Sequence, residues 1–431
     1  MKHLFLVFAL LLVAVPAPAA PIAHREVLGN GIVLLVAERP EVPLVTVRVF
    51  SRAGAVFEPP DKAGLANLTG SVVTRGTAKR SAQEIDAAIE FVGGRLEASA
   101  GRDGMTSSLS VLRRDLGLGL DLLQEVVLSP AFPEAQVQRK IREIQAAIQR
   151  SEENPGGVAS RALGKLVFGA HPYGRPVEGT RESVGKLTRD DVVKFYADRV
   201  RPDATVIAIV GALTVAEARA EIGKRFGAWA AAPGSTPTVP VASAGGPPQR
   251  EVIKRELTQA TIMLGRQAVN QRDPDYFPLA VASYVLGGGS ASRLYGRVRD
   301  DGGLAYSVFS YVSPGKYGAG LTISSQTRTA EVPKVTDILR REATRIGREP
   351  VTDAELSLAK SYLIGSFPLR LDTAAKVADF LVAVEELGLG LDYADRYRER
   401  IAAVTATDVQ RVGAKYYAPD TFHQVVVGNL P

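Results

Sequence analysis

The feature that most constrains the fold of this chain is an internal repeat. Six positions recur in two parts of the sequence, and each matched pair is separated by 217 residues. The pairs are Asp191 and Asp408, Val192 and Val409, Pro202 and Pro419, Asp203 and Asp420, Val210 and Val427, and Gly211 and Gly428. Each copy has a helix start, a Pro-Asp break and an apolar strand that ends in glycine. A repeat of this length indicates a duplicated domain.

A segment rich in proline, glycine and small residues separates the two copies. It begins at Pro233, ends at Pro248 and has little hydrophobic periodicity, which is typical of a linker. A chain of 431 residues is also too long for one ordinary core. We therefore expect an N-terminal domain over 24–232, a linker over 233–248 and a C-terminal domain over 249–431.

The first half mixes strand and helix signals. Asn30-Gly31 lies between apolar runs and predicts a hairpin. The alternation over Val45–Phe50 predicts a strand with one buried face. Ser81 and Glu84 have the spacing of a capping box and predict the start of a helix.

The second half shows the same mixture. The sequence predicts a helix over Asp275–Leu286, strands over Ala305–Tyr311 and Gly320–Ser324, and a capping box at Thr352-Asp-Ala-Glu355. Neither half has the strict βαβ rhythm of a parallel sheet. We expect an α+β fold of two homologous domains, each a mainly antiparallel sheet with helices packed on one face.

The N-terminus has the organisation of a secretory signal peptide. A positive start at Lys2 is followed by an apolar run over Leu4–Val15 and by small residues up to Ala20. We expect residues 1–20 to be removed and the protein to be periplasmic or secreted, with a retained membrane anchor as the alternative. The chain has no cysteine, so neither a disulfide nor a lipid-bearing cysteine is available.

The charge pattern argues against a nucleic-acid partner. The net charge of +6 is spread along the chain without a basic run. Solubility is the simplest explanation of this excess, and attraction to acidic peptides or an anionic membrane face is the alternative. No later segment is apolar enough to predict an integral membrane span.

A motif in the first half resembles the signature of a known family. Gly64-Leu-Ala-Asn67-Leu-Thr-Gly70-Ser71 is followed by Thr74-Arg-Gly-Thr77. This resembles the pitrilysin/insulinase family of zinc peptidases, which includes the mitochondrial processing peptidases. In that family Gly-Leu-Ala leads into His-x-x-Glu-His, where two histidines hold zinc and the glutamate activates the bound water.

The resemblance implies that the zinc site is degenerate in this chain. The family's histidines and glutamate match Asn67, Gly70 and Ser71. Its third ligand, a glutamate on a later helix, matches a position at about Ala147.

The histidine count leads to the same expectation without the family. The chain has four histidines, His3, His24, His171 and His423, each isolated from other ligand types. A tetrahedral zinc site needs clustered histidine, cysteine or carboxylate ligands. We therefore expect no cofactor in this chain, and the resemblance implies that a partner subunit holds the zinc.

A glycine-rich segment in the second half carries the remaining candidate site. Gly288-Gly289-Ser290 precedes Arg299 and Tyr306. Phosphate binding is disfavoured because no Gly-Lys-Ser/Thr follows. The family has a similar Gly-Gly-x-x-Ser-x-Leu segment followed by an arginine and a tyrosine at this spacing.

The resemblance implies roles for these five residues. Arg299 and Tyr306 would be catalytic, stabilising the oxyanion of the cleaved peptide across the chamber from the zinc. Gly288, Gly289 and Ser290 would bind substrate. The competing structural interpretation pairs Arg299 with Asp300 or Asp301 and packs the tyrosine in a strand.

The similarity covers roughly residues 25–430 and suggests half of a clamshell chamber. The family builds its chamber from four such domains, and this chain supplies two. We expect a zinc-less subunit that works with a zinc-bearing homologous peptidase on peptides or unfolded polypeptides. The alternatives are an inert structural or peptide-binding core subunit and, less favoured, an independent enzyme with non-metal chemistry, for which no Ser/His/Asp arrangement is found.

Overall fold

The structure is a computed structural model that describes residues 22–230, 237–243 and 246–430. The predicted signal peptide, residues 1–20, lies outside the described residues. Residues 231–236 and 244–245, in and beside the predicted linker, also lie outside them.

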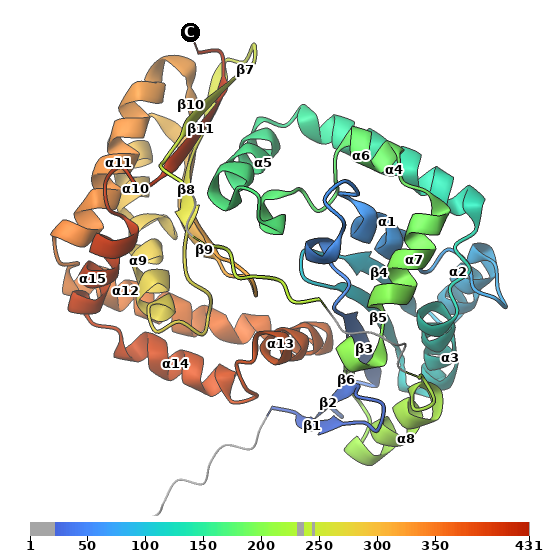
Figure 1. Cartoon of the computed structure of the whole chain (residues 1–431). Coiled ribbons are helices and arrows are strands. Elements are labelled where there is room, and N and C mark those ends of the chain that lie inside the picture. The colour runs from blue at the N-terminus through green and yellow to red at the C-terminus, as the bar shows by residue number, and fades with distance from the viewer. Residues whose placement is uncertain (1–21, 231–236, 244–245, 431) are drawn as a thin grey trace, which may run out of the picture.

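The first half contains a six-stranded sheet with the order β1-β2-β6-β3-β5-β4 (Figure 1). Its strands β2 and β6 run parallel, and its other neighbouring pairs run antiparallel. The predicted hairpin at Asn30-Gly31 joins the first two strands. The strands are β1 His24–Val27, β2 Val33–Glu38, β3 Leu44–Ser51, β4 Arg95–Ala100, β5 Met105–Leu112 and β6 Thr205–Gly211.

The second half repeats this arrangement in five strands. Its order is β7-β11-β8-β10-β9, which corresponds to β2-β6-β3-β5-β4 of the first sheet, again with one parallel pair, β7 and β11. The predicted α+β fold with mainly antiparallel sheets is confirmed. The strands are β7 Arg250–Lys254, β8 Gln259–Gln267, β9 Ala305–Ser313, β10 Gly320–Arg328 and β11 His423–Gly428.

The helices begin where the sequence signals predict. The capping boxes at Ser81 and Thr352 open α2 and α12. Within the repeat, Thr188 and Thr405 cap α7 and α15 in the same way. The first-half helices are α1 Leu65–Val72, α2 Ala82–Phe91, α3 Leu116–Leu128, α4 Glu134–Glu152, α5 Pro155–Phe168, α6 Arg181–Gly185, α7 Arg189–Arg199 and α8 Val215–Phe226. The second-half helices are α9 Tyr276–Gly287, α10 Arg293–Tyr295, α11 Val332–Arg348, α12 Asp353–Ser366, α13 Ala374–Leu387, α14 Tyr393–Ala403 and α15 Ala406–Tyr416.

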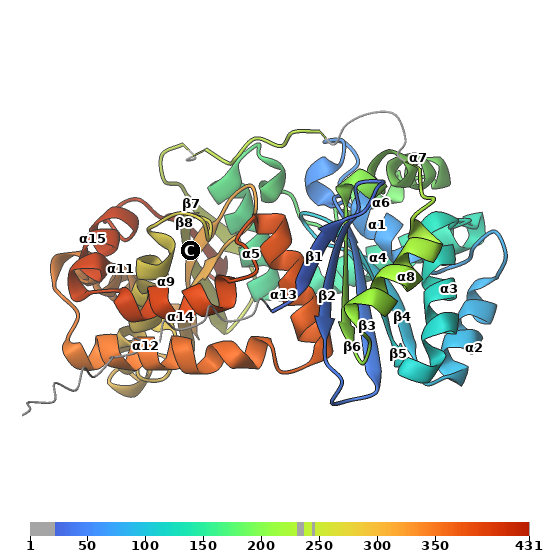
Figure 2. The same ribbon diagram turned by 90° about the horizontal axis from the view of Figure 1, so that it is seen from below.

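One helix of each half also packs on the sheet of the other half. On β6, Ile207 and Ile209 pack against the helices of their own half. The alternate residues Val206, Ala208 and Val210 face away and pack against α13. Figure 2 shows α13 beside the strands of this sheet. The opposite faces of one strand are therefore covered by helices from different halves.

The exchange is reciprocal. Helix α5 of the first half covers β8 and β11 of the second sheet, where Leu163 and Val167 meet Met263 and Val425 (Figure 1). Burial on both faces explains why β6 and β11 read as continuous apolar runs rather than alternating ones.

The packing of α13 on the first sheet makes one expectation for β3 wrong. The sequence predicts one buried face, but both faces of this strand are largely covered because α13 lies across the second one. The helices of each half do pack on one face of their own sheet, as predicted. The helix on the other face comes from a distant part of the chain.

Candidate functional site

The start of α1 is fixed by a buried carboxylate. Glu58 accepts hydrogen bonds from the backbone N–H groups of Gly64, at 3.2 Å, and Ala66, at 2.6 Å. These donors belong to the unpaired first turn of the helix. Burial raises the pKa of the Glu58 carboxyl from 4.5 to about 7, although the two backbone hydrogen bonds and Arg175 oppose the rise.

Helix α1 carries three of the four degenerate zinc-site positions, and it packs too tightly for the missing glutamate. A Cβ atom at Gly70 would lie 2.6 Å from the backbone nitrogen of Ala100 on β4. The Ser71 hydroxyl donates to the Asn67 carbonyl oxygen at 2.7 Å. These residues do not fit a zinc ion, because the helix offers no imidazole or carboxylate and has no room for one at position 70.

The fourth position, Ala147, lies exposed on α4, a helix that packs against α1. Its methyl group cannot coordinate a metal. In the described ranges, no group of three or more histidine, cysteine, aspartate or glutamate side chains could hold a metal ion.

The histidines in the described ranges serve structural contacts. His171 accepts a hydrogen bond from the backbone N–H of Tyr173 at 3.1 Å, and its Nε2 lies 2.9 Å from the Pro240 carbonyl oxygen. His423 accepts from the backbone N–H of Gln249 at 3.2 Å. His24 lies 3.7 Å from Glu26.

In the second half, the structure brings Arg299 and Tyr306 together. The guanidinium carbon of Arg299 lies 4.8 Å from the centre of the Tyr306 ring. The same carbon lies 4.9 Å from the ring centre of Tyr295, whose hydroxyl accepts a hydrogen bond from Nη1. The guanidinium therefore contacts two aromatic rings, an arrangement that favours a cation.

Two backbone irregularities produce this arrangement. Arg299 lies in a π-helical turn, Gly296–Asp300, which directly continues α10. Tyr306 is the extra residue of a β-bulge, because Ser307 pairs with Gln326 whereas Ala305 pairs with Thr327. Bulges redirect side chains, and the Tyr306 side chain is 83% exposed.

Arg299 has no carboxylate partner among the residues that the structure describes. Asp301 is bound instead by Arg297, at 3.1 Å, and Asp300 is exposed. The ion pair of Arg299 with Asp300 or Asp301, which the competing interpretation expected, is not formed. The guanidinium keeps its charge available for an oxygen ligand.

The glycine-rich segment lies at the end of α9, next to this pair of residues in the fold. Gly288 caps the helix, and a Cβ there would lie 2.5 Å from a ring carbon of Tyr284. A Cβ at Gly289 would lie 3.2 Å from the Tyr284 hydroxyl oxygen, while Ser290 is exposed. Helix α9 packs on β9, and so does the π-helical turn. The glycine-rich segment and Arg299 thus belong to elements that pack on the same strand.

Comparison with known proteins connects these features to a family. Residues 33–181 match "Insulinase (Peptidase family M16)", and residues 186–363 match "Peptidase M16 inactive domain". An uncharacterized zinc protease of Streptomyces coelicolor is 30% identical over 399 residues, which cover 90% of this chain and 86% of that protein. The chain belongs to the M16 peptidase family.

Other known proteins resemble the chain in sequence or in fold. An uncharacterized zinc protease of Mycobacterium tuberculosis is 31% identical over 372 residues, covering 83% of this chain and 82% of that one. The M16 inactive domain of Pseudomonas fluorescens superposes with a TM-score of 0.89 at 25% identity, covering 95% of this chain and 98% of that one. A Helicobacter pylori protease shares the fold, with a TM-score of 0.86 at 19% identity over 95% of this chain and 100% of that one.

The two family descriptions match successive parts of this M16 chain. The peptidase description ends within the first half at residue 181, and the inactive-domain description runs from residue 186 to residue 363 in the second half. Across the described ranges, no helix combines the length and apolarity needed to cross a bilayer.

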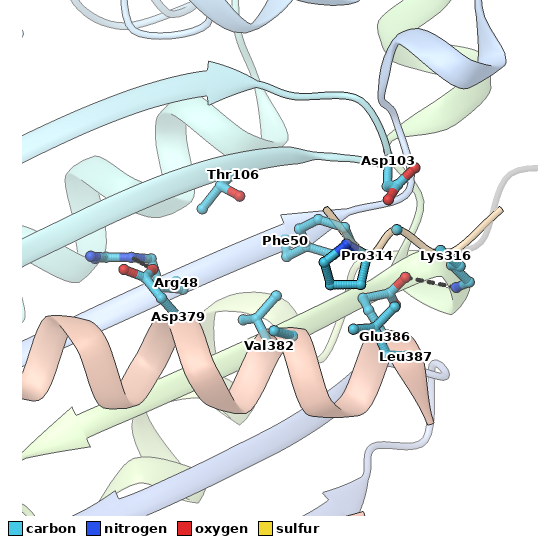
Figure 3. A pocket seen from close by; sticks show the side chains of 12 residues that line it. Arg48, Phe50, Asp103, Thr106, Pro314, Lys316, Asp379, Val382, Glu386 and Leu387 are labelled. Carbon is cyan, nitrogen blue, oxygen red and sulfur yellow. Dashed lines mark hydrogen bonds and ion pairs between the residues drawn. The ribbon is translucent and has the colours of Figure 1, made fainter. Parts of the chain in front are cut away.

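A separate cavity of about 290 Å³ lies where α13 crosses the first sheet (Figure 3). Four of its five charged groups form two ion pairs: Arg48 with Asp379 at 2.6 Å, and Lys316 with Glu386 at 2.9 Å. The first pair joins the two halves of the M16 chain, and the second lies within the second half. This cavity is therefore better explained as part of the contact between the halves than as a second reaction site.

Sequence reasoning missed Tyr295. The residue lies four positions before Arg299, a spacing that places two side chains on one face of a helix. This four-residue spacing can be read from the sequence. The π-helical turn that follows Tyr295 cannot be predicted from it.

Proposed function

We propose that this chain is the zinc-less subunit of a heterodimeric M16 metalloendopeptidase, to which it contributes Arg299 and Tyr306. The observation that carries the proposal is the state of Arg299. Its guanidinium is oriented by two aromatic rings and is left without a carboxylate partner in the described part of the chain. The guanidinium is half-buried, and its remaining N–H donors are accessible to an oxygen ligand.

The chemistry of this pair suits an oxyanion. Arg299 offers several N–H donors in one plane, and the Tyr306 hydroxyl offers one more. Donors fixed in advance stabilise the negative charge that develops on a peptide carbonyl oxygen when it is attacked. Bound zinc in the partner subunit would supply Lewis-acid chemistry and an activated water.

The proposal includes a zinc-bearing homologous partner because α1 does not fit the metal. Gly70 is packed against β4, and Asn67 and Ser71 offer no suitable ligands. We propose that the peptide or unfolded polypeptide substrate adds as a strand to an exposed sheet edge of the chamber, a mode that reads mainly the backbone. We also propose that the protein acts in the periplasm or outside the cell, after loss of residues 1–20.

The alternative is an inert structural or peptide-binding core subunit. The "inactive domain" description of residues 186–363 favours this alternative. The two proposals differ in what they expect of Arg299, since an inert subunit has no use for an oriented, unpaired guanidinium.

The test is a peptide-cleavage assay of the complex with Arg299→Ala or Tyr306→Phe in this chain. We expect kcat to fall about 100-fold for the arginine variant, as for loss of an oxyanion donor, and about 10-fold for the tyrosine variant. Arg297→Ala is the matched control, because Arg297 lies on the same turn but pairs with Asp301. Full activity of both Arg299→Ala and Tyr306→Phe would favour the inert subunit.

A further inference from the structure

We propose that Tyr295 is a positioning residue that sets the plane and direction of the Arg299 guanidinium. The inference rests on the proposed role of Arg299 and extends it to a residue for which neither the motif nor the comparisons give a role. Tyr295 would not touch the substrate. It would act through the arginine alone.

The contacts between the two side chains are of two kinds. The Tyr295 hydroxyl accepts a hydrogen bond from Nη1 of Arg299. The Tyr295 ring also lies under the guanidinium, with 4.9 Å between the guanidinium carbon and the ring centre. The hydrogen bond fixes the direction of the guanidinium and the ring contact fixes its plane.

Tyr295 is the more firmly held of the two rings. It is partly buried and packs against the core of the second half. Tyr306 is 83% exposed. An exposed ring cannot by itself hold a guanidinium in one orientation, so the anchored ring and its hydroxyl carry most of the positioning.

The backbone supports the same geometry. The N–H of Asp301 bonds to the Gly296 carbonyl oxygen at 2.8 Å, the widened pattern of a π-helical turn. The N–H of Gly303 bonds to the Arg299 carbonyl oxygen at 3.0 Å. Tyr295 and Arg299 therefore rise from one continuous, hydrogen-bonded segment.

The occupied Nη1 has a consequence for the remaining donors. A guanidinium has five N–H groups in a fixed plane. Tyr295 receives one of them, no carboxylate in the described ranges receives another, and the rest are left for a ligand oxygen. Misplacing such donors by about 1 Å costs up to about 100-fold in rate.

The first measurement uses the full chain alone. NMR of arginine side chains reports how fast each guanidinium rotates, and Arg299→Lys identifies the signal of Arg299. We expect slow rotation in the wild type and fast rotation in Tyr295→Phe, which keeps the ring but removes the hydroxyl. Equal rotation rates in the two proteins would overturn the inference without touching the proposed function.

The second measurement is a double-mutant cycle in the reconstituted peptidase, with the zinc-bearing M16 homologue from the same organism as partner. We expect Tyr295→Phe to lower kcat about 10-fold with KM within about twofold, as for loss of a charge-assisted hydrogen bond. Tyr295→Leu, which also removes the ring, should lose more. In the Arg299→Ala background, Tyr295→Phe should have no further effect.

Controls separate positioning from folding. Tyr362→Phe is the matched control, because that ring stacks on Tyr284 at 4.6 Å between ring centres and its hydroxyl has no bonded partner in the described ranges. It should leave kcat unchanged. Equal losses from Tyr295→Phe with and without Arg299 would overturn the positioning role. If Arg299→Ala is itself fully active, the proposed function fails instead.

Discussion

At the residue scale, the degenerate zinc site lacks its ligands and also has no room for a side chain at Gly70. Gly70 touches the backbone of β4 so closely that no side chain fits without movement of one of the two elements. The buried Glu58 fixes the first turn of the same helix. Gly70 allows α1 to pack closely on β4, and Glu58 holds the start of the helix.

A Gly70→Ala substitution should therefore destabilise the protein. Its Cβ would lie 2.6 Å from the Ala100 nitrogen, and such overpacking costs about 1–3 kcal/mol. Urea unfolding measures the change in the free energy of unfolding. Gly223→Ala on α8 is the control, because a Cβ there meets nothing within 4 Å and should stabilise the helix by about 0.5–1 kcal/mol. Equal effects of the two substitutions would contradict the packing of α1.

Glu58 should make stability depend on pH. Burial raises the pKa of its carboxyl from 4.5 to about 7, so the folded state binds this proton more tightly than the unfolded state. The stabilising contribution is complete below the ordinary pKa and is lost as the pH rises through about 7. Glu58→Gln removes this dependence. The free energy of unfolding of the wild type should fall relative to that of the variant between about pH 5 and about pH 8, and a constant difference would show that Glu58 does not titrate in this range.

Single residues could be predicted from the sequence where a motif fixes them. Asn67, Gly70 and Ser71 were located by the spacing of the family motif, and the structure places them on one short helix. Arg299 and Tyr306 were located in the same way. Their mutual contact could not be predicted, because it depends on a π-helical turn and a β-bulge that leave no clear mark in a single sequence.

At the scale of elements, local sequence signals predicted helices and strands well, but they did not predict which helices pack on which sheet. The capping boxes at Ser81 and Thr352 and the hairpin at Asn30-Gly31 form as expected. The exchange of α5 and α13 between the halves could not be read from local patterns. The buried runs of β6 and β11 were its one visible trace, since a strand covered on both faces loses its alternation.

The exchanged helices should be as important for stability as the cores of the halves. Leu381 on α13 is fully buried against the first sheet, and Leu163 on α5 is buried against the second. Truncation to alanine should cost about 2–5 kcal/mol at each site. Denaturant unfolding of Leu163→Ala and Leu381→Ala measures this. Leu369→Ala, at a side chain that is 62% exposed, should have a much smaller effect, and similar losses at all three sites would contradict the packing.

At the scale of the whole molecule, the two halves pack into each other and are not two independent domains on a linker. Each sheet needs a helix from the other half, and Tyr173 bridges them by donating to Asp103 at 2.6 Å while accepting from the Tyr317 backbone at 3.1 Å. We expect one cooperative unfolding transition. Fluorescence of Trp229, the single tryptophan, reports on the first half, and circular dichroism reports on both. Separate midpoints for the two signals would show that the halves unfold independently.

At this scale we propose that the chain is one subunit of an active heterodimeric peptidase and not an inactive remnant of one. The direct measurement is reconstitution, in which peptide cleavage is assayed with this chain alone, with the zinc-bearing M16 homologue alone, and with both. We predict cleavage by the mixture only, and about a 100-fold loss of activity when the mixture contains Arg299→Ala. Cleavage by this chain alone, or an Arg299→Ala mixture as active as the wild type, would contradict it.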